Sequence, residues 1–373
     1  MSAELIAALL LPLPRIARGL EENATYVVVI PAHDEAGTIE QTLAAVVPEL
    51  AGHGSILVVA DNCTDETAAA ARSAGASVIV RRDPRRRGKG YAIDFAVKHL
   101  ANSPPDVVII LDADCTPDPG TFAILHSACR HWNRPVQARY ELVRPKKDAG
   151  PLARVGYFAW QIKNILRPAG LSALRVPCLL TGTGMAFPWR TLASSQLATG
   201  HIVEDMVLGL ELAARDQGAL FLPEACVRSA LPPSLEGQKT QRTRWETGHL
   251  QVIRQQVPWL IAQAVLRLDY RLLTLALHTA VPPLALFGLM LPTITGASGI
   301  LALLGGPTLA FRLSGLAIVM ASVVFAAYWH LVGRNLLFWR DLALLPGYVA
   351  AKIPLYVRAL AGRQVQWIRS KRD

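Results

Sequence analysis

The sequence has few charged residues and few cysteines for its length. Only 18% of its 373 residues are Asp, Glu, Lys or Arg, against about 25% in a typical soluble protein. No two of its five cysteines form a Cys-x-x-Cys pair, which argues against a structural zinc site and for a reducing compartment. Signatures of helix-turn-helix, zinc-finger and RNA-recognition modules are absent too, so we expect no nucleic-acid partner despite a net charge of +10.

The positive charge is confined to two segments. Residues 81–89 have a net charge of +5 and residues 334–373 a net charge of +6, so the rest of the chain is close to neutral. Hydrophobic residues make up 52% of the sequence, and its mean hydropathy is +0.30. This composition excludes a disordered chain and indicates contact with a membrane. At about 150 residues per domain, the length predicts two to three domains.

The N-terminal segment, residues 1–23, has a short apolar run interrupted by Pro12 and Pro14. No basic stretch precedes this run, and no clear small-residue cleavage site follows it. We therefore interpret it as an interfacial anchor and not as a signal peptide.

Short β-branched runs alternate with helical segments in the next part of the chain. Strands are expected at residues 26–30, 56–60, 77–80 and 107–111, with a helix at 38–50. This alternation predicts an α/β domain with a parallel sheet that is covered on both faces. Three of the strands end in polar clusters. Ligands of such sheets bind beyond the carboxyl ends of the strands, so we expect one site there.

The composition changes after Tyr270. Arg312 is the only formally charged residue between 272 and 333. Residues 272–295 and 313–333 each reach the roughly 20 residues that a membrane-spanning helix requires, and prolines would kink the first. Two spans would return the basic tail, residues 334–373, to the side of the N-terminal domain, which is the cytoplasm by the positive-inside rule. We thus expect a multi-pass inner-membrane protein with a cytoplasmic catalytic domain.

Two further apolar segments carry isolated charges. Residues 342–360 fit an in-plane interfacial helix better than a third span. Residues 152–174 fit a membrane-surface helix or a core helix equally well.

Two carboxylates one residue apart, Asp112 and Asp114, directly follow the strand at 107–111. Carboxylate oxygens at a strand end can bind Mg²⁺ or Mn²⁺ together with substrate phosphates. Alternatively, the two residues are only the polar end of a strand and bind no ligand. The position at the carboxyl edge of the sheet favours the metal site.

The other strand ends offer groups that suit a nucleotide. Asp61 can accept hydrogen bonds from a base or a ribose, whereas Asp65 is expected to cap the following helix. The exit of the first strand, from Pro31 to Glu35, can cradle a nucleoside. His33 within it is interpreted as an ordinary loop residue.

Two glycine-rich segments can approach a ligand closely. Lys89 stands between two glycines before a helix and suits a phosphate; a solvated basic loop is the alternative, and the segment lacks the pattern of a Walker A loop. The second segment contains Gly182, Thr183 and Gly184, and its lack of large side chains would let an acceptor or a sugar lie close to the backbone. A tight strand connection would use the same residues.

Two helical segments complete the candidate site. Glu204 and Asp205 open a helix, where Asp205 can act as a general base, although acids at this position also complement the helix dipole. Gln241, Arg244 and Trp245 share one helix face within the interfacial region expected at residues 237–271. That face offers an amide, a guanidinium for a departing diphosphate and a ring for a sugar. An interfacial Arg/Trp belt is the alternative.

The order of these motifs resembles that of the family 2 glycosyltransferases with a GT-A fold, in the branch that includes cellulose, chitin and hyaluronan synthases. The motifs in order are Asp61, Asp112-x-Asp114, Glu204-Asp205 and Gln241-x-x-Arg244-Trp245. Locally, the chain resembles bacterial exopolysaccharide glycosyltransferases of the methanolan-biosynthesis type. The resemblance covers residues 24–255. It implies a GT-A domain with a Rossmann-like, mostly parallel sheet over residues 24–236, followed by interfacial and transmembrane helices.

The resemblance also implies a role for each matching residue. Asp205 would be the catalytic base. In the donor site, Asp61 would contact the nucleoside base and Asp112 the nucleotide. Asp114 would bind Mg²⁺ or Mn²⁺ on the diphosphate. The diphosphate and acceptor site would be closed by Gln241, Arg244 and Trp245.

The chain departs from the family pattern in three respects. The usual double Asp of the second strand is Ala60-Asp61 here, and Asp34 stands where the first-strand motif has Asn. Processive members of the family also have more spans. These departures bear on which nucleotide base the donor carries and on whether the enzyme adds one sugar or many.

We therefore expect an inverting, metal-dependent transfer from a nucleotide-diphosphate sugar, with UDP favoured, to a lipid-linked or growing saccharide in exopolysaccharide or cell-surface glycan synthesis. The alternatives are a glycosyltransferase acting on a ceramide-like or hopanoid-like lipid, and a processive synthase completed by exopolysaccharide assembly partners. A non-catalytic membrane scaffold with a nucleotide-sensing domain is disfavoured, because it has no need of all six residues Asp112, Asp114, Asp205, Gln241, Arg244 and Trp245.

Overall fold

The computed structural model describes residues 1–11, 24–50, 53–144, 150–231 and 234–360. An eight-stranded mixed sheet has the strand order β3-β2-β1-β4-β7-β6-β8-β5. The strands are β1 (Thr25–Ala32), β2 (His53–Asp61), β3 (Ser77–Arg81), β4 (Val107–Ile110), β5 (Cys115–Pro117), β6 (Val136–Leu142), β7 (Met185–Pro188) and β8 (Leu220–Ser229).

Helices cover the sheet and form the C-terminal part. Those of the sheet domain are α2 (Ala36–Val46), α3 (Thr67–Ser73), α4 (Lys89–Leu100), α5 (Thr121–Trp132), α8 (Trp189–Ala193) and α9 (Glu204–Ala214), with a short 3₁₀ turn η1 (Val47–Glu49) after α2. The others are α1 (Ser2–Leu10), α6 (Pro151–Gln161), the π-helix η2 (Ile162–Leu166), α7 (Arg167–Ala173), α10 (Leu235–Arg267), α11 (Tyr270–Ala280), α12 (Leu284–Leu303), α13 (Leu309–Leu331), η3 (Gly333–Asn335), α14 (Trp339–Leu342), α15 (Leu345–Ala350) and α16 (Ile353–Leu360).

The four strands expected from the sequence are present as β1 to β4, and they pair in parallel. The sheet becomes mixed beyond them, because β7 runs antiparallel to both β4 and β6. Alternate residues of β1 enter different cores: Val28 and Ile30 pack with α2 and α5, whereas Val27 and Val29 pack with α4 and α9. Burial on both faces explains why the strand reads as a continuous apolar run.

The expected bounds of the first span, residues 272–295, are wrong, although two candidate spans do lie within residues 272–333. The structure divides this segment into α11 and α12 at Val281, Pro282 and Pro283. A residue that precedes proline avoids the helical region, so the two prolines end the helix and do not merely kink it. Helix α11 packs against α10 and buries Leu272 and Leu275 in a cluster with α9.

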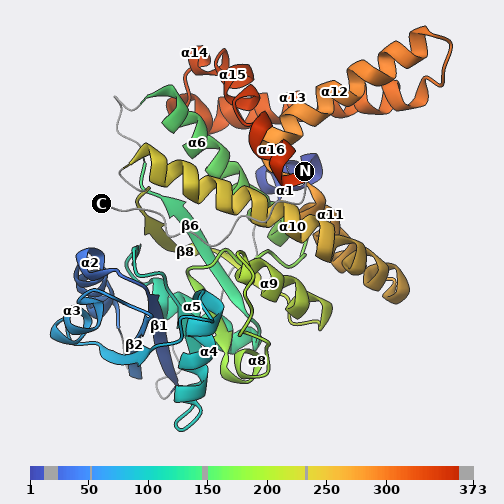
Figure 1. Ribbon diagram of the computed structural model, residues 1–373. Helices are drawn as coiled ribbons and strands as arrows, with labels where there is room; N and C mark the ends of the chain where they lie inside the picture. The colour runs from blue at the N-terminus through green and yellow to red at the C-terminus, as the bar shows by residue number, and fades with distance from the viewer. Residues whose placement is uncertain (12–23, 51–52, 145–149, 232–233, 361–373) are drawn as a thin grey trace.

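Helices α12 and α13 form a hairpin that projects from the body of the protein (Figure 1). Both are long and apolar enough to cross a membrane, and only 17% and 11% of their most apolar windows are buried. Segment 342–360 contains only short helices in the described residues, α15 and α16 among them. These fall short of the roughly 20 residues of a span.

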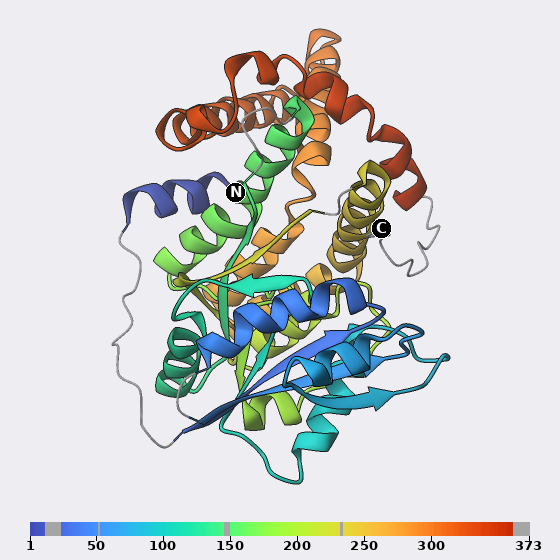
Figure 2. The ribbon, with the colours of Figure 1, turned by 90° about the vertical axis from the view of Figure 1, so that its left-hand side faces the viewer.

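Figure 2 shows the C-terminal helices on one side of the sheet domain, with α6 (green) and α10 (yellow) leading toward them. Of the two interpretations of residues 152–174, core packing fits better. Phe158 and Leu166 pack with α13, and Leu171 packs with α9 and α10.

Helix α1, the first part of the expected interfacial anchor, is docked on α7. Buried Glu4 accepts a hydrogen bond from Arg167 Nε at 2.9 Å, and its other oxygen lies 3.0 Å from His278 Nδ1. A Cβ at Gly170 would lie 1.9 Å from the backbone oxygen of Glu4, so only glycine permits this approach. The rest of the expected anchor, residues 12–23, lies outside the described residues.

Candidate active site

Two adjoining pockets lie beyond the carboxyl end of β4, and one of them extends to the ends of β1 and β2. The strand-edge pocket is lined by residues that include Pro31, Glu35, Asp61, Lys89, Asp112, Asp114, Glu204 and Arg244. The central pocket is lined by residues that include Lys89, Asp112, Asp114, Gly182, Glu204, Asp205, Gln241, Arg244 and Trp245. The two pockets meet, because both are lined by the same six residues: Lys89, Asp112, Asp114, Ile202, Glu204 and Arg244.

Asp61 is held in place from β3. It is 6% exposed, and its Oδ1 accepts hydrogen bonds from Arg81 Nη1 at 2.6 Å and from Asn62 Nδ2 at 3.0 Å. The Arg81 guanidinium lies 5.5 Å from the ring centre of Tyr91 on α4. The β2 carboxylate therefore reaches the strand-edge pocket in one fixed orientation.

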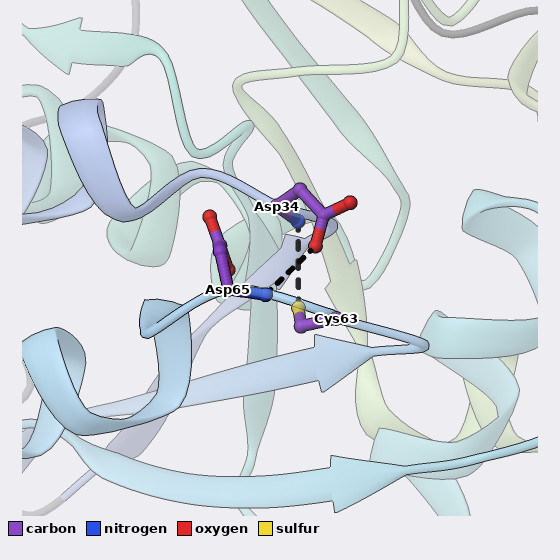
Figure 3. Close-up of side chains that lie close together, drawn as sticks. All are labelled: Asp34, Cys63 and Asp65. Atoms are coloured by element: carbon purple, nitrogen blue, oxygen red, sulfur yellow. Dashed lines mark hydrogen bonds between the residues drawn. The ribbon is translucent and has the colours of Figure 1, made fainter.

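The loops after β1 and β2 are tied together by Asp34, Cys63 and Asp65 (Figure 3). Asp34 Oδ1 accepts hydrogen bonds from the backbone nitrogens of Thr64 at 2.6 Å and Asp65 at 3.3 Å, while its own nitrogen donates to Cys63 Sγ. Asp65 accepts from the nitrogen of Thr67 at the start of α3, as a helix cap does. The three side chains are close enough to ligate an ion, but these hydrogen bonds give them a loop-closing role.

Lys89 begins α4 after Gly88, whose φ of 134° suits glycine. Its ammonium contacts the Asp112 carboxylate and donates a hydrogen bond to the carbonyl of Gly182 at 2.6 Å. Burial alone would lower the pKa of Lys89, but the charges of Asp112 and Glu204 raise it above its usual value. A charged lysine is thus fixed where the two pockets meet.

Asp112 and Asp114 fit a divalent cation. Their carboxylates and the Cys115 thiol bring ligand atoms within 4.8 Å of one another. Burial raises the pKa of Cys115 well above its usual value, and its Sγ lies 3.6 Å from Asp114 Oδ1 as a hydrogen-bond donor. The effective ligands are therefore two carboxylates, which suit Mg²⁺ or Mn²⁺.

The glycine-rich turn supports the site more than it lines it. Gly182 lines the central pocket at a φ of 89°, and a Cβ there would lie 3.3 Å from Asp205 Oδ2. Thr183 is fully buried, and its hydroxyl accepts a hydrogen bond from the nitrogen of Asp112. Gly184 is buried against β6 and β8. Thr183 and Gly184, expected to face an acceptor, pack behind the pocket instead.

Glu204 and Asp205 both line the central pocket at the start of α9. Burial raises the pKa of Glu204, and the neighbouring Asp205 adds to this effect. Burial also raises the pKa of Asp205, against the opposing charge of Lys89. A buried carboxyl group with a raised pKa beside a pocket has the properties that a general base requires.

Gln241, Arg244 and Trp245 all line the central pocket from α10, as their spacing predicted. Gln241 is 8% exposed, and within the described residues neither its Oε1 nor Arg244 Nε has a hydrogen-bond partner. Thr181 Oγ1, in the same wall, also has none there. Buried polar atoms are nearly always paired, so this wall is built for a polar ligand.

The lining residues that the sequence did not predict include Tyr140, Trp160 and Lys163. The Trp160 ring lies 5.1 Å from that of Trp245 and 5.0 Å from that of Tyr140, and its Nε1 donates to the carbonyl of Tyr140. The Trp-x-x-Lys spacing in segment 152–174 was the available signal. It was assigned to packing or to a membrane surface.

Comparison with known proteins gives matches at three levels. Residues 23–248 match the family described as "Glycosyltransferase like family 2". A probable glucomannan 4-beta-mannosyltransferase of Arabidopsis thaliana is 25% identical over 66% of this chain and 47% of its own length. A glucosyl-3-phosphoglycerate synthase of Mycolicibacterium paratuberculosis is 38% identical over 24% of this chain and 28% of its own length. The matches thus span less than half of either relative.

A mannosyltransferase from Pyrobaculum calidifontis, solved in complex with GDP-Man and Mn²⁺, matches 97% of this chain and 94% of its own. The TM-score is 0.58 and the sequence identity 19%. This likeness confirms the predicted fold, a GT-A-like α/β domain with a mixed sheet followed by long apolar helices. The narrower methanolan-type resemblance stays a prediction.

Proposed function

Because the chain belongs to the family 2 glycosyltransferases, we propose that it transfers a sugar from a UDP-sugar to a hydroxyl of a lipid-linked or growing saccharide. The reaction would take place at the cytoplasmic face of the inner membrane, in exopolysaccharide or cell-surface glycan synthesis. One observation carries the proposal: the Asp205 carboxylate shares a pocket with Asp112, Asp114 and the α10 residues Gln241, Arg244 and Trp245.

The strand-edge pocket is the proposed donor site. Asp61 binds the nucleoside, which lies against Pro31 and Glu35. Asp112 and Asp114 hold Mg²⁺ or Mn²⁺, which when bound neutralises negative charge on the leaving diphosphate. Lys89 and Arg244, where the pockets meet, place further positive charge beside the same group.

Asp205 is the proposed catalytic base. Its carboxylate takes the proton from the acceptor hydroxyl while that oxygen forms a bond to the anomeric carbon. The bond from this carbon to the diphosphate oxygen breaks, and its electron pair leaves with the nucleoside diphosphate. A single displacement inverts the configuration at the anomeric carbon. Trp245 and Trp160 offer flat rings for the acceptor sugar.

Two features support a membrane-bound acceptor. The α12–α13 hairpin follows closely on the helices that line the site, and its exposed apolar surface suits insertion into a bilayer. A polymer synthase is the second candidate, favoured by the similarity to a probable glucomannan mannosyltransferase. The two candidates predict different products.

Transfer can be measured in isolated membranes with Mn²⁺ and a panel of radiolabelled nucleotide sugars. We expect label in solvent-extractable lipid, whereas label in ethanol-insoluble polymer would favour the synthase. Asp205→Asn should lower transfer by about 100- to 10,000-fold while nucleotide binding persists. Asp216→Asn is the matched control, since Asp216 lies exposed beyond the end of α9 with a φ of 59° that asparagine tolerates. Loss of donor binding in Asp205→Asn would refute the base assignment.

A further inference from the structure

A lysine in the wall of the central pocket has no counter-ion in contact with it among the described residues. Lys163, on the π-helix η2, is only partly exposed. Within the described residues, its ammonium has neither a hydrogen bond nor an ion pair. It lines the central pocket and also a third cavity, here called the α12 pocket. A cation held in this way between two cavities is suited to an anionic ligand.

The π-helix explains why the lysine faces the cavities. Pro168 has no backbone N–H, and its ring would clash with the carbonyl of Asn164 in a regular α-helix. The chain instead widens by one residue, so that Arg167 N–H donates to the carbonyl of Ile162, five positions earlier. Lys163 and Asn164, inside this bulge, both line the central pocket. Such bulges occur frequently at functional sites.

The charges around Lys163 do not neutralise it. Burial lowers the pKa of Lys163, and the nearby Arg167 charge lowers it further; Asp205 and Glu246 oppose these effects through space rather than by contact. Glu246 is already engaged: it contacts the Lys352 ammonium and accepts a hydrogen bond from the Tyr356 hydroxyl at 2.9 Å. Removing a charge from most of its water is costly when no counter-ion contacts it among the described residues, so an anion from a ligand would stabilise the site.

The α12 pocket leads from this lysine toward the apolar hairpin. Its wall includes Pro283, Leu284 and Ala285, where the chain enters α12. It shares Trp160, Lys163, Trp245 and His249 with the central pocket. Lys163 therefore lies between the central pocket, which contains Asp205, and the base of the helices proposed to enter the membrane.

We propose that Lys163 binds the diphosphate of a lipid-diphosphate-linked saccharide, the acceptor of the transfer. The lipid enters through the α12 pocket, and the saccharide extends past the Trp160 and Trp245 rings toward Asp205. The donor diphosphate is bound separately at the Asp112–Asp114 end. This assignment rests on the proposed function and specifies its acceptor as an anionic lipid.

Protection from acetylation tests the site directly. The full chain in phosphatidylcholine nanodiscs is treated with acetic anhydride, and the rate at Lys163 is followed by peptide mass spectrometry relative to exposed Lys98. Saturating farnesyl diphosphate should slow the reaction at Lys163 at least fivefold and leave Lys98 unchanged, whereas farnesol and inorganic diphosphate should not protect. Equal protection by inorganic diphosphate, protection by UDP-sugar with Mn²⁺ alone, or no protection would each overturn the proposal.

Product chemistry and variants give an independent test. Label in the lipid product should be released by mild acid, as expected for a diphosphate link and not for a simple glycolipid. Lys163→Gln should reduce transfer to lipid at least tenfold, Lys163→Arg should restore most of it, and Lys98→Gln should have no effect. Acid-stable label in the wild-type product would overturn the lipid-diphosphate acceptor alone, whereas no transfer by the wild type would refute the proposed function itself.

Discussion

Replacing Gly182 with alanine would place a methyl group beside the proposed base. The new Cβ would lie 3.3 Å from Asp205 Oδ2 and 3.7 Å from Lys89 Nζ. The second distance is an ordinary contact, but the first is tight, and the carboxylate must move by a few tenths of an ångström. The substitution therefore perturbs the position of the base more than the position of the lysine.

The size of the effect follows from two contributions. A left-handed backbone costs a non-glycine residue roughly 1–2 kcal/mol of folding free energy. Gly75, after α3, has a φ of 87°, close to the 89° of Gly182, but no atom lies within 4 Å of its Cβ position. Misplacing a reacting group by about 1 Å can cost 100-fold in rate, so the smaller shift at Asp205 predicts a loss of roughly three- to tenfold in kcat.

Gly75→Ala is therefore the matched control for Gly182→Ala. Both variants should lose similar stability in thermal unfolding, and only Gly182→Ala should lose kcat for sugar transfer, with the donor KM little changed. If the two variants had equal kcat values, or if Gly182→Ala chiefly raised the donor KM, the placement of Asp205 as the base beside this turn would be refuted.

Three further predictions concern charge. Asp114→Ala should abolish transfer together with its stimulation by Mn²⁺; full activity in this variant would contradict the metal assignment. The kcat should rise with pH through the raised pKa of Asp205, since the base acts when deprotonated, so an acid limb near pH 4 would contradict this role. Glu4→Gln should lower the free energy of unfolding at pH 7 by roughly 3–5 kcal/mol. Burial would raise the pKa of Glu4, but His278 and Arg167 lower it to about 2, so this difference should shrink in denaturation curves as pH falls from 4.5 toward 2.

The strands and motifs could be predicted because they depend on local patterns. Continuous β-branched runs identify strands buried on both faces, and parallel strands bring their carboxyl ends to one edge. Asp61, Asp112 and Lys89 were therefore placed correctly around one pocket. The α10 residues Gln241 and Arg244 depend on helix spacing, which is equally local.

The missed features depend on contacts between distant segments. Residues 272–295 have the composition of a span, yet Leu272 and Leu275 pack against α9 and α10, because the prolines after Ala280 allow α11 to turn away from α12. Lys163 reaches the pocket only through a π-bulge, which apolar periodicity does not reveal. Glu4 has its partners on α7 and α11, so a sequence pattern treats it as an isolated charge near the N-terminus.

The charge balance of the site links the binding of the divalent cation to the binding of the donor. Where the two pockets meet, three carboxylates, Asp112, Asp114 and Glu204, face two cations, Lys89 and Arg244, and Asp205 lies close by. Burial raises the pKa values of Glu204 and Asp205 on α9, and this excess of negative charge adds to the effect. A divalent cation on Asp112 and Asp114 would remove this excess, and the donor diphosphate would then offer Lys89 a replacement for Asp112. Donor and cation should therefore bind together more tightly than either does alone, leaving Lys163 as the separate positive charge for the acceptor.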